Sequence, residues 1–302
     1  MHKGAGMNKI CIYGGLGNQM FQYALYAAFR KRGIKARISF ARYFYEHHHH
    51  GFELWKAFQL PLQARQRFCS NAVTTMEPYY RNGLCEWLFR SIIPRVESRG
   101  YVRYREKEEF EYDPLIFQQK ESLIEGIWQV ESYFRDLQDD LRREFRFRLP
   151  ADPYQQALVE RIQATSSVSL HVRRGDYFGQ EYGKTHSVLS SLDYYRHAVD
   201  FIRGRVSNPQ FFVFSDDIAW VKEHLPLGAV TYVDHNKGDL SYLDMYLMSI
   251  CKHNIIANST FSWWGAWLNA APDKTVTIPD VWIHGKKCPG IYPEGWIRLP
   301  VD

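Results

Sequence analysis

Two adjacent arginines, followed by a glycine and an aspartate, form the segment of this chain best suited to chemistry. Arg173, Arg174, Gly175 and Asp176 come directly after residues 168–172, where apolar and polar side chains alternate as in a β-strand. Guanidinium groups are planar, forked donors that suit a diphosphate, and a glycine permits a tight turn. The alternative interpretation is a surface loop in which an arginine pairs with Asp176.

Polar clusters follow three of the strands that the second half of the chain predicts. The clusters are His171 with Arg173, Arg174 and Asp176; Ser215 with Asp216 and Asp217; and Asn258 with Ser259 and Thr260. Ligands of open parallel sheets bind beyond the carboxyl ends of the strands, so three clusters at one edge predict a binding site. Each cluster taken alone has a simpler interpretation, because Asp216 and Ser259 are also good helix N-caps.

Each cluster suits one part of a nucleoside diphosphate. The arginines neutralise the phosphates, and Ser259 and Thr260, at a helix start, add hydroxyl and amide donors to the same anion. A carboxylate accepts hydrogen bonds from the edge of guanine, and Asp216 or Asp217 is placed to do so. The sequence therefore favours a nucleoside diphosphate group at this edge.

Regular spacing in the second half predicts a parallel, doubly wound sheet. Strands are expected at 168–172, 211–214, 229–233, 255–257 and 275–278, with helices at 192–206, 216–224, 240–251 and 260–270. Trp263 and Trp264, in the last helix, suit either the core or stacking on a base or sugar. We expect one of the two rings to lie in the core and the other to stack on the ligand.

A glycine loop opens the first half. The expected elements are a strand at 8–13, a helix at 20–32 and a strand at 36–40. Asn18 and Gln19 are expected to cap the helix. The loop lacks Gly-Lys-Ser/Thr, and Met20 stands where a dinucleotide fingerprint has Gly or Ala. Gly15 and Gly17 therefore form either a tight turn or a loop that approaches a ligand at a helix N-terminus.

Size and charge narrow the classes of partner. The chain has 302 residues and is 45% hydrophobic, enough for two globular domains. Prolines 150 and 153 suggest a boundary between residues 1–150 and 151–302. A net charge of +5 suits anionic small ligands or peripheral association with an acidic membrane surface. No long Lys/Arg block is present, so nucleic acid is not an expected partner.

The cysteines and the termini favour a reducing cytoplasm. The five cysteines are scattered without Cys-x-x-Cys, which argues against a disulfide framework or zinc site. Residues 1–6 resemble a disordered leader, with Met7 as an alternative start, and no apolar run suits a signal peptide or membrane span. Four adjacent histidines at 47–50 cannot all face one metal ion, so we interpret them as a solvated loop.

Four blocks of the sequence resemble the bacterial α-1,2-fucosyltransferases of glycosyltransferase family 11. They are residues 14–22, 171–177, 214–217 and 258–266, and they run in family order across nearly the whole chain. The His-x-Arg-Arg-Gly-Asp block is shared with α-1,6- and protein O-fucosyltransferases. The glycine block and the Asn-Ser-Thr block together narrow the resemblance to the α-1,2 family. Residues 126–134 are close to a further family block, with Ile127 and Val130 where Tyr and Ser are usual.

The resemblance implies an α/β fold of GT-B type: two facing Rossmann-like domains with the donor cleft between them. Residues 1–150 would form the acceptor-side domain and residues 151–302 the GDP-fucose-binding domain, with a C-terminal tail able to pack back on the first. The implied reaction is an inverting, metal-independent transfer of L-fucose from GDP-β-L-fucose to the 2-hydroxyl of a terminal β-galactoside. Lactose and N-acetyllactosamine type glycans are implied acceptors, in surface glycan or O-antigen synthesis at the inner face of the bacterial membrane.

Carried onto this chain, the resemblance assigns catalytic roles to Arg174, Asp176 and His171. It assigns donor binding to Gly15, Gly17, Asn18, Gln19, Arg173, Arg174, Ser215, Asp216, Asp217, Asn258, Ser259, Thr260 and Phe261. Arg174 would grip the β-phosphate. Asp176 would act either as the base for the acceptor hydroxyl or as the residue that orients the arginines. No cofactor or metal is expected, because Asp-x-Asp is absent and arginines can stabilise the leaving GDP.

Two other hypotheses of function are compatible with the sequence. The enzyme could use another GDP-sugar or form another linkage, which a panel of GDP-sugars would reveal. The chain could also be a nucleotide- or glycan-binding module without catalysis, which would bind GDP yet release none from GDP-fucose when lactose is present.

Overall fold

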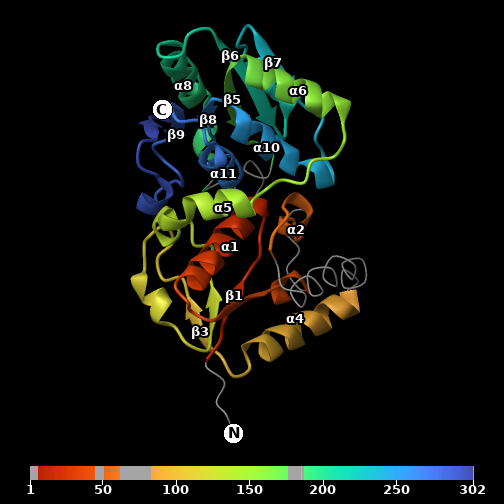
Figure 1. Cartoon of the computed structure of the whole chain (residues 1–302), viewed down its shortest axis with the longest axis vertical. Helices are drawn as coiled ribbons and strands as arrows, with labels where there is room; N and C mark the ends of the chain where they lie inside the picture. Colours follow the sequence, from red (N-terminus) through yellow and green to blue (C-terminus); the bar gives the residue numbers. More distant parts are fainter. Residues whose placement is uncertain (1–5, 45–50, 62–82, 176–184, 186, 302) are drawn as a thin grey trace. The chain divides into compact units, whose positions relative to one another are not determined.

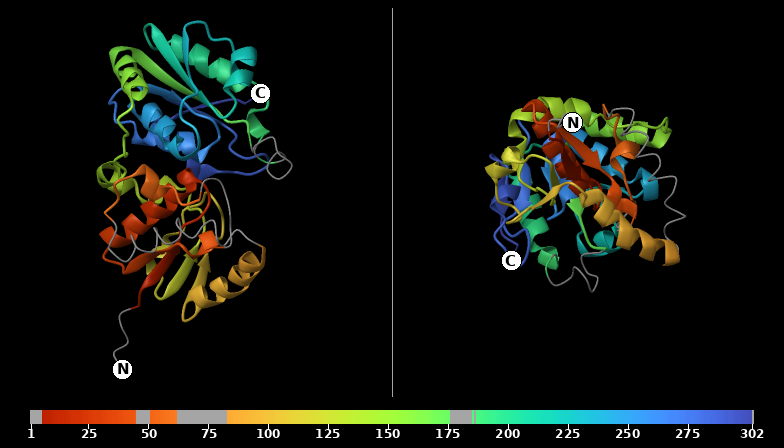
Figure 2. Two further views of the ribbon diagram at one scale, coloured as in Figure 1. Left: turned by 90° about the vertical axis from the view of Figure 1, so that its right-hand side faces the viewer. Right: turned by 90° about the horizontal axis from the view of Figure 1, so that it is seen from below.

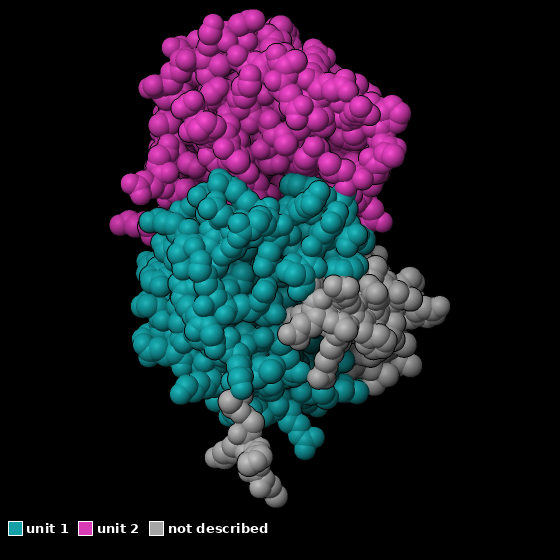
Figure 3. Space-filling view, in the orientation of Figure 1, with its two compact units in different colours: residues 1–148 teal, residues 149–302 magenta. Residues whose placement is uncertain are grey.

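Two sheets of parallel strands, one in each half of the chain, organise this computed structural model. It describes the chain except residues 1–5, 45–50, 62–82, 176–184, 186 and 302. The chain divides into units of residues 1–148 and 149–302, close to the boundary at 150 that the prolines suggest (Figure 3). Asp176 and the histidines at 47–50 lie outside the described residues.

The first unit contains a four-stranded parallel sheet in the order β2-β1-β4-β3. Its strands are β1 Asn8–Cys11, β2 Ala36–Ser39, β3 Val102–Arg105 and β4 Ser122–Glu125. The helices of this unit are α1 Leu16–Lys31, α2 Leu54–Ala57, α4 Gly83–Ser98 and α5 Gln138–Glu144, and the 3₁₀ helices are η1 Ala41–Phe44, η2 Pro114–Gln118, η3 Glu131–Tyr133 and η4 Arg135–Leu137. The sequence predicts β1 and β2 but not β3 and β4.

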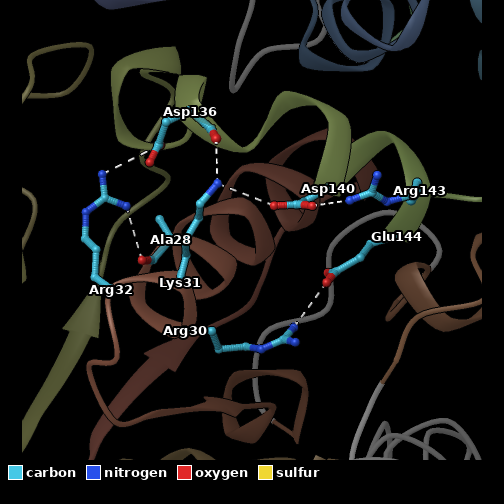
Figure 4. A network of polar contacts seen from close by, with 8 residues as sticks. All are labelled: Ala28, Arg30, Lys31, Arg32, Asp136, Asp140, Arg143 and Glu144. Carbon is cyan, nitrogen blue, oxygen red and sulfur yellow. Dashed lines mark hydrogen bonds and ion pairs between the residues drawn. The ribbon is translucent and has the colours of Figure 1, made fainter.

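Helix α1 is the central helix of the first unit, and nearly all of it is buried. Its last turn carries basic side chains, which favour a helix C-terminus. Arg30 pairs with Glu144 at 3.3 Å, Lys31 with Asp140 at 3.5 Å and Arg32 with Asp136 at 3.7 Å (Figure 4). These exposed pairs add little stability singly, but together they fix η4 and α5 against α1.

The second unit contains a six-stranded parallel sheet in the order β10-β9-β8-β5-β6-β7, as the sequence predicts for a doubly wound sheet. Its strands are β5 Ser166–Val172, β6 Pro209–Ser215, β7 Val230–Val233, β8 His253–Ile255, β9 Val276–Pro279 and β10 Ile297–Leu299. Its helices are α6 Pro153–Ala164, α8 Asp193–Arg203, α9 Ile218–His224, α10 Tyr242–Ile250 and α11 Thr260–Leu268, with 3₁₀ helices η6 Ser187–Leu189, η7 Gly238–Leu240 and η8 Pro289–Ile291. Strand β10, which the sequence does not predict, places this part of the C-terminal tail in the second unit.

Helices cover both faces of the second sheet (Figures 1 and 2). One core joins Leu170 and neighbouring strand residues to α8 and α9, and the other joins Phe212 and Phe214 to α6 and α10. Strand β5 is therefore buried on both faces. The polar side chains that alternate with its apolar ones are buried as well. Asn254 Nδ2 donates to Ser169 Oγ at 2.7 Å, which satisfies two buried polar groups in the sheet.

None of the helices that the structure describes is long and apolar enough to cross a membrane.

Candidate functional site

The sheet of the second unit brings the three predicted polar clusters to one edge. Val172 of β5 pairs in parallel with Ser215 of β6, and Leu170 pairs with Ile255 of β8 on the other side. The segments that follow these strands therefore leave the sheet side by side. The carboxyl edge at the centre of a doubly wound sheet is where such folds bind ligands.

The two arginines are held by the two aspartates that follow β6. Arg173 Nη1 lies 3.3 Å from Asp216 Oδ2, and Arg174 Nε lies 3.7 Å from Asp217 Oδ2. The backbone amide of Arg174 also donates to Asp216 Oδ1 at 2.9 Å. Both arginine side chains remain about a quarter exposed, so a ligand can reach them.

The guanidinium of Arg174 also stacks on an aromatic ring. Its Cζ lies 3.5 Å from the centroid of Trp220, in helix α9. A flat stacked guanidinium is restricted in orientation and keeps its edge available for two parallel hydrogen bonds. The sequence analysis did not select Trp220. The only feature of the sequence that could have indicated it is its position, three residues after Asp217.

Gly175 lies where the backbone passes close to the side chain of Asp216. A Cβ atom there would lie 2.6 Å from Asp216 Oδ2, so any larger residue would push that carboxylate aside. The glycine thus permits the carboxylate to hold both the amide of Arg174 and the side chain of Arg173.

His171, the last residue but one of β5, is buried at this edge. Burial, with a smaller effect of the Arg173 charge, lowers its pKa from 6.5 to about 3, so the imidazole is neutral near pH 7. Its ring lies 5.9 Å from that of Phe261 between centroids. Its Nδ1 is buried and has no hydrogen-bond partner among the described residues. A neutral ring with an unused nitrogen suits a hydrogen bond to a ligand.

Helix α11 starts at the same edge, and the side chain of its N-cap residue does not cap it. Ser259 occupies the N-cap position, but its side chain makes no capping hydrogen bond. Asn258 is buried and donates to the carbonyl oxygen of Trp282 at 3.1 Å. The Ser259 hydroxyl and the first amides of α11, including those of Thr260 and Phe261, are thus positioned for an anion.

The tryptophans of α11 belong to the core. Trp263 and Trp264 are both fully buried, and Trp263 Nε1 donates to the carbonyl oxygen of Ile291 at 2.8 Å. The expectation that one of them stacks on a ligand is therefore wrong. The helix is too apolar around its circumference to leave either ring at the surface.

A fourth strand end lies at this edge and was missed by the sequence reasoning. Strand β7 pairs in parallel with β6, and the polar segment 234–239 follows it. His235 Nε2 lies 2.9 Å from Asp152 Oδ2, and Asn236 Nδ2 donates to Asp244 Oδ1 at 2.7 Å. Burial raises the pKa of Asp244 to about 7. Four consecutive polar residues directly after a strand were the available signal.

In the first unit the glycine loop differs from the expectation. Helix α1 starts at Leu16 rather than at Met20, and Gly15 is its N-cap. Gln19 is fully buried and donates to the carbonyl oxygens of Gly14 and Gly51, both at 2.8 Å. Its Oε1 accepts from the amides of Glu53 and Leu54. The amide of Gln19 is thereby saturated, and it shapes the loop instead of facing a ligand.

Asn18, by contrast, is half-buried and contacts a residue that the sequence reasoning did not select. Gln129 Nε2 donates to Asn18 Oδ1 at 3.0 Å. The segment before Gln129 is held by Glu106, whose carboxylate accepts from the amides of Ile127 at 2.7 Å and Trp128 at 3.1 Å. The signal was the block at residues 126–134, whose role the sequence left open.

The described residues contain no group of three or more His, Cys, Asp or Glu side chains arranged to hold a metal ion.

Comparisons with known proteins agree on one family. A sequence profile described as "Glycosyl transferase family 11" matches residues 94–299. The "Alpha-1,2-colitosyltransferase" of Escherichia coli is 33% identical over 95% of this chain and 97% of that protein. The "O-antigen biosynthesis glycosyltransferase WbnK" of Escherichia coli is 30% identical over 96% of this chain and 99% of that protein.

More distant similarities extend to animal and rhizobial proteins. The human "Galactoside alpha-(1,2)-fucosyltransferase 1" is 29% identical over 49% of this chain and 44% of that protein. Among solved structures, the fucosyltransferase NodZ from Bradyrhizobium covers 87% of this chain and 92% of its own, with 15% identity and a TM-score of 0.49.

Proposed function

This chain belongs to glycosyl transferase family 11, and we propose that it transfers L-fucose from GDP-β-L-fucose to the 2-hydroxyl of a terminal β-galactoside, with inversion at the anomeric carbon. Near full-length similarity to two glycosyltransferases of Escherichia coli supports sugar transfer as the activity. The linkage is supported by the names of two relatives, an α-1,2-colitosyltransferase and an α-(1,2)-fucosyltransferase.

The arginine pair at the end of β5 carries the proposal. Arg173 and Arg174 are oriented by Asp216 and Asp217 and remain partly exposed at the carboxyl edge of the sheet. The start of α11 adds the hydroxyl of Ser259 and backbone amides. Such a set of fixed donors matches a diphosphate.

The chemistry follows from where charge develops. When the bond between the sugar and GDP breaks, negative charge grows on the β-phosphate while the sugar becomes oxocarbenium-like. Donors held in place before the reaction stabilise this charge without reorganisation, which lowers the barrier. We assign this task to Arg174, stacked on Trp220, with Arg173 beside it.

The remaining site residues take supporting roles in this proposal. His171 offers a neutral imidazole to the donor, and Ser215, Asn258, Thr260 and Phe261 form the walls at the strand ends. Asp216 and Asp217 orient the arginines, and one of them also binds guanine. In the first unit, Gln19 shapes the loop that contains Gly15 and Gly17.

We propose that Asp176 is either the base for the acceptor hydroxyl or the residue that orients the arginines. An Asp176→Asn variant separates the two roles through its pH profile. Loss of a base removes the acidic limb of the rate profile, whereas loss of an orienting carboxylate raises the KM of the donor and keeps that limb.

A second donor is favoured by a specific observation, since one of the relatives most similar in sequence is a colitosyltransferase. Colitose lacks the 3-hydroxyl of fucose, so a site that binds this hydroxyl would discriminate strongly between the two donors. Assays with GDP-fucose and GDP-colitose on a panel of β-galactosides decide between them, with the product linkage read by NMR. GDP binding with no GDP release from either donor would indicate a binding module.

Substitution of Arg174 tests the donor site. We expect Arg174→Ala to abolish measurable transfer with the fold intact, and Arg174→Lys to recover little, because lysine lacks the planar fork. Arg196→Ala is the matched control, since Arg196 is an exposed arginine of the same unit that pairs with Asp193. Near wild-type turnover by folded Arg174→Ala would refute the assignment.

Removal of metal ions tests the charge argument. If guanidinium groups stabilise the leaving GDP, the rate of transfer should be unchanged by a chelator. A rate that collapses with chelator and recovers with magnesium or manganese would contradict the proposed role of the arginines.

A further inference from the structure

Asn18 and Gln129 form a pair of side-chain amides at the carboxyl edge of the sheet in the first unit. Asn18 lies in the first turn of α1, which follows β1, and Gln129 lies in the segment that follows β4. Strands β1 and β4 are parallel neighbours, so both residues leave the sheet at the same edge. Gln129 Nε2 donates to Asn18 Oδ1 at 3.0 Å, which fixes each amide relative to the other.

One nitrogen and one oxygen of the pair have no hydrogen-bond partner among the residues that the structure describes. Within the described part of the chain, Asn18 Nδ2 and Gln129 Oε1 have no hydrogen-bond partner, and both side chains are only half-buried. A hydroxyl group both donates and accepts, so vicinal hydroxyls of a sugar ring match this pattern. A phosphate offers acceptors alone and would leave Gln129 Oε1 facing an anion.

The charges around the pair also favour a neutral ligand. The carboxylate of Glu53 accepts from the amide of Leu16 at 3.2 Å, at the start of α1 where an anion would otherwise bind. The carboxylate of Glu106 occupies the amides of Ile127 and Trp128. Two backbone sites suited to an anion are thus filled by the protein's own carboxylates.

The loop that carries Gln129 is built for a fixed position. Trp128 is fully buried and has a φ of 62°, a left-handed conformation that is rare for a bulky residue. A Cβ atom on Gly126 would lie 2.6 Å from the Glu106 side chain. Residues held this way place Gln129 reproducibly against Asn18, as a binding group requires.

We propose that the amide pair of Asn18 and Gln129 binds hydroxyl groups of a neutral sugar ring, and takes no part in holding the diphosphate or base of the donor. The inference rests on the proposed function, because it places a substrate sugar at the first unit. The ring belongs either to the galactoside acceptor or to the sugar being transferred, which present the same chemistry.

Kinetics and GDP binding test the pair together. We expect Gln129→Leu and Asn18→Ala each to raise the KM of a sugar substrate about tenfold, with the affinity for GDP changed by less than about twofold. A raised KM for the galactoside alone identifies the acceptor, and a raised KM for the GDP-sugar alone identifies the transferred sugar. Because the residues act as a unit, the double variant should lose little more than either single variant.

Gln119→Leu is the matched control. Gln119 is a half-buried glutamine of the same unit, but it precedes β4 and therefore lies at the opposite edge of the sheet. It should leave both KM values unchanged. Weakened GDP binding in Gln129→Leu, or unchanged KM values in folded variants of both residues, would overturn the proposal.

Failure of the proposed function would appear in the wild type itself, as absence of transfer from every GDP-sugar tested. The amide pair is then tested by saturation-transfer NMR with lactose and L-fucose. Binding of either sugar by the wild type that is lost in Gln129→Leu supports the inference, and binding that persists, or is absent from the wild type, contradicts it.

Discussion

The buried imidazole of His171 makes the stability of the fold depend on pH. Its pKa is lowered from 6.5 to about 3 in the folded protein. Between these values the unfolded chain takes up a proton that the folded protein does not, so the free energy of unfolding falls as pH falls below about 6.5.

We expect the group to remove about 2 kcal/mol of stability between pH 7.5 and pH 5, a dependence that His171→Gln should lack. Urea unfolding of the two proteins at both pH values measures the difference between their slopes. Equal slopes would show that the imidazole is able to accept a proton in the folded state.

Other residue-scale details could not be predicted from the sequence. The sequence places Asp216 and Ser259 as helix caps, but in the structure Asp217 caps α9 and Asp216 holds the arginines. Either aspartate has the chemistry to cap a helix, so residue type alone does not decide between them. The contact between Gln129 and Asn18 joins residues 111 apart, a pairing with no local sequence signal.

At the scale of elements, the two helices that start at the site edge differ in what their N-caps do. Asp217 accepts from the amide of Trp220 at 3.1 Å and caps α9, whereas Ser259 makes no capping hydrogen bond for α11. A working N-cap contributes about 1 kcal/mol, while an unused one contributes little. The two N-cap residues therefore differ in how much each contributes to the stability of the fold.

We expect Asp217→Ala to lower the free energy of unfolding by about 1 kcal/mol, and Ser259→Ala to lower it by less than about 0.5 kcal/mol. Ser259→Ala should instead weaken GDP binding, because we propose that its hydroxyl binds the phosphates. Urea unfolding and titration calorimetry measure the two effects. A Ser259→Ala variant that is destabilised yet binds GDP normally would show that the serine acts as a cap.

The predictability of the elements follows from their burial. In the second unit, apolar strands alternate with helices, and the sequence predicts a strand at each of β5 to β9, although β8 lies at residues 253–255 rather than 255–257. Strand β3 is an edge strand of four residues with Val102 70% exposed, so its sequence carries no buried pattern to recognise. Strand β10 has three residues, none of them buried, and is defined only by its pairing with β9.

At the scale of the whole molecule, the two units have separate sheets and separate carboxyl edges with different chemistry. The edge in the second unit presents Arg173, Arg174 and the start of α11, whereas the edge in the first presents the Asn18 and Gln129 amides beside two carboxylates. A negatively charged donor and a neutral sugar would thus be recognised by chemically distinct edges.

Hydrogen exchange with GDP locates the donor edge in the intact protein. Saturating GDP should slow amide exchange in segments 173–175, 215–217 and 258–262, because bound ligand removes their opening fluctuations and stabilises the folded state. Residues 204–208 precede β6 at the opposite edge of the same sheet and serve as the internal reference, with no change expected. Mass spectrometry of peptic peptides measures all four segments at once. Protection confined to the first unit would mean that the arginines at the end of β5 do not hold the diphosphate.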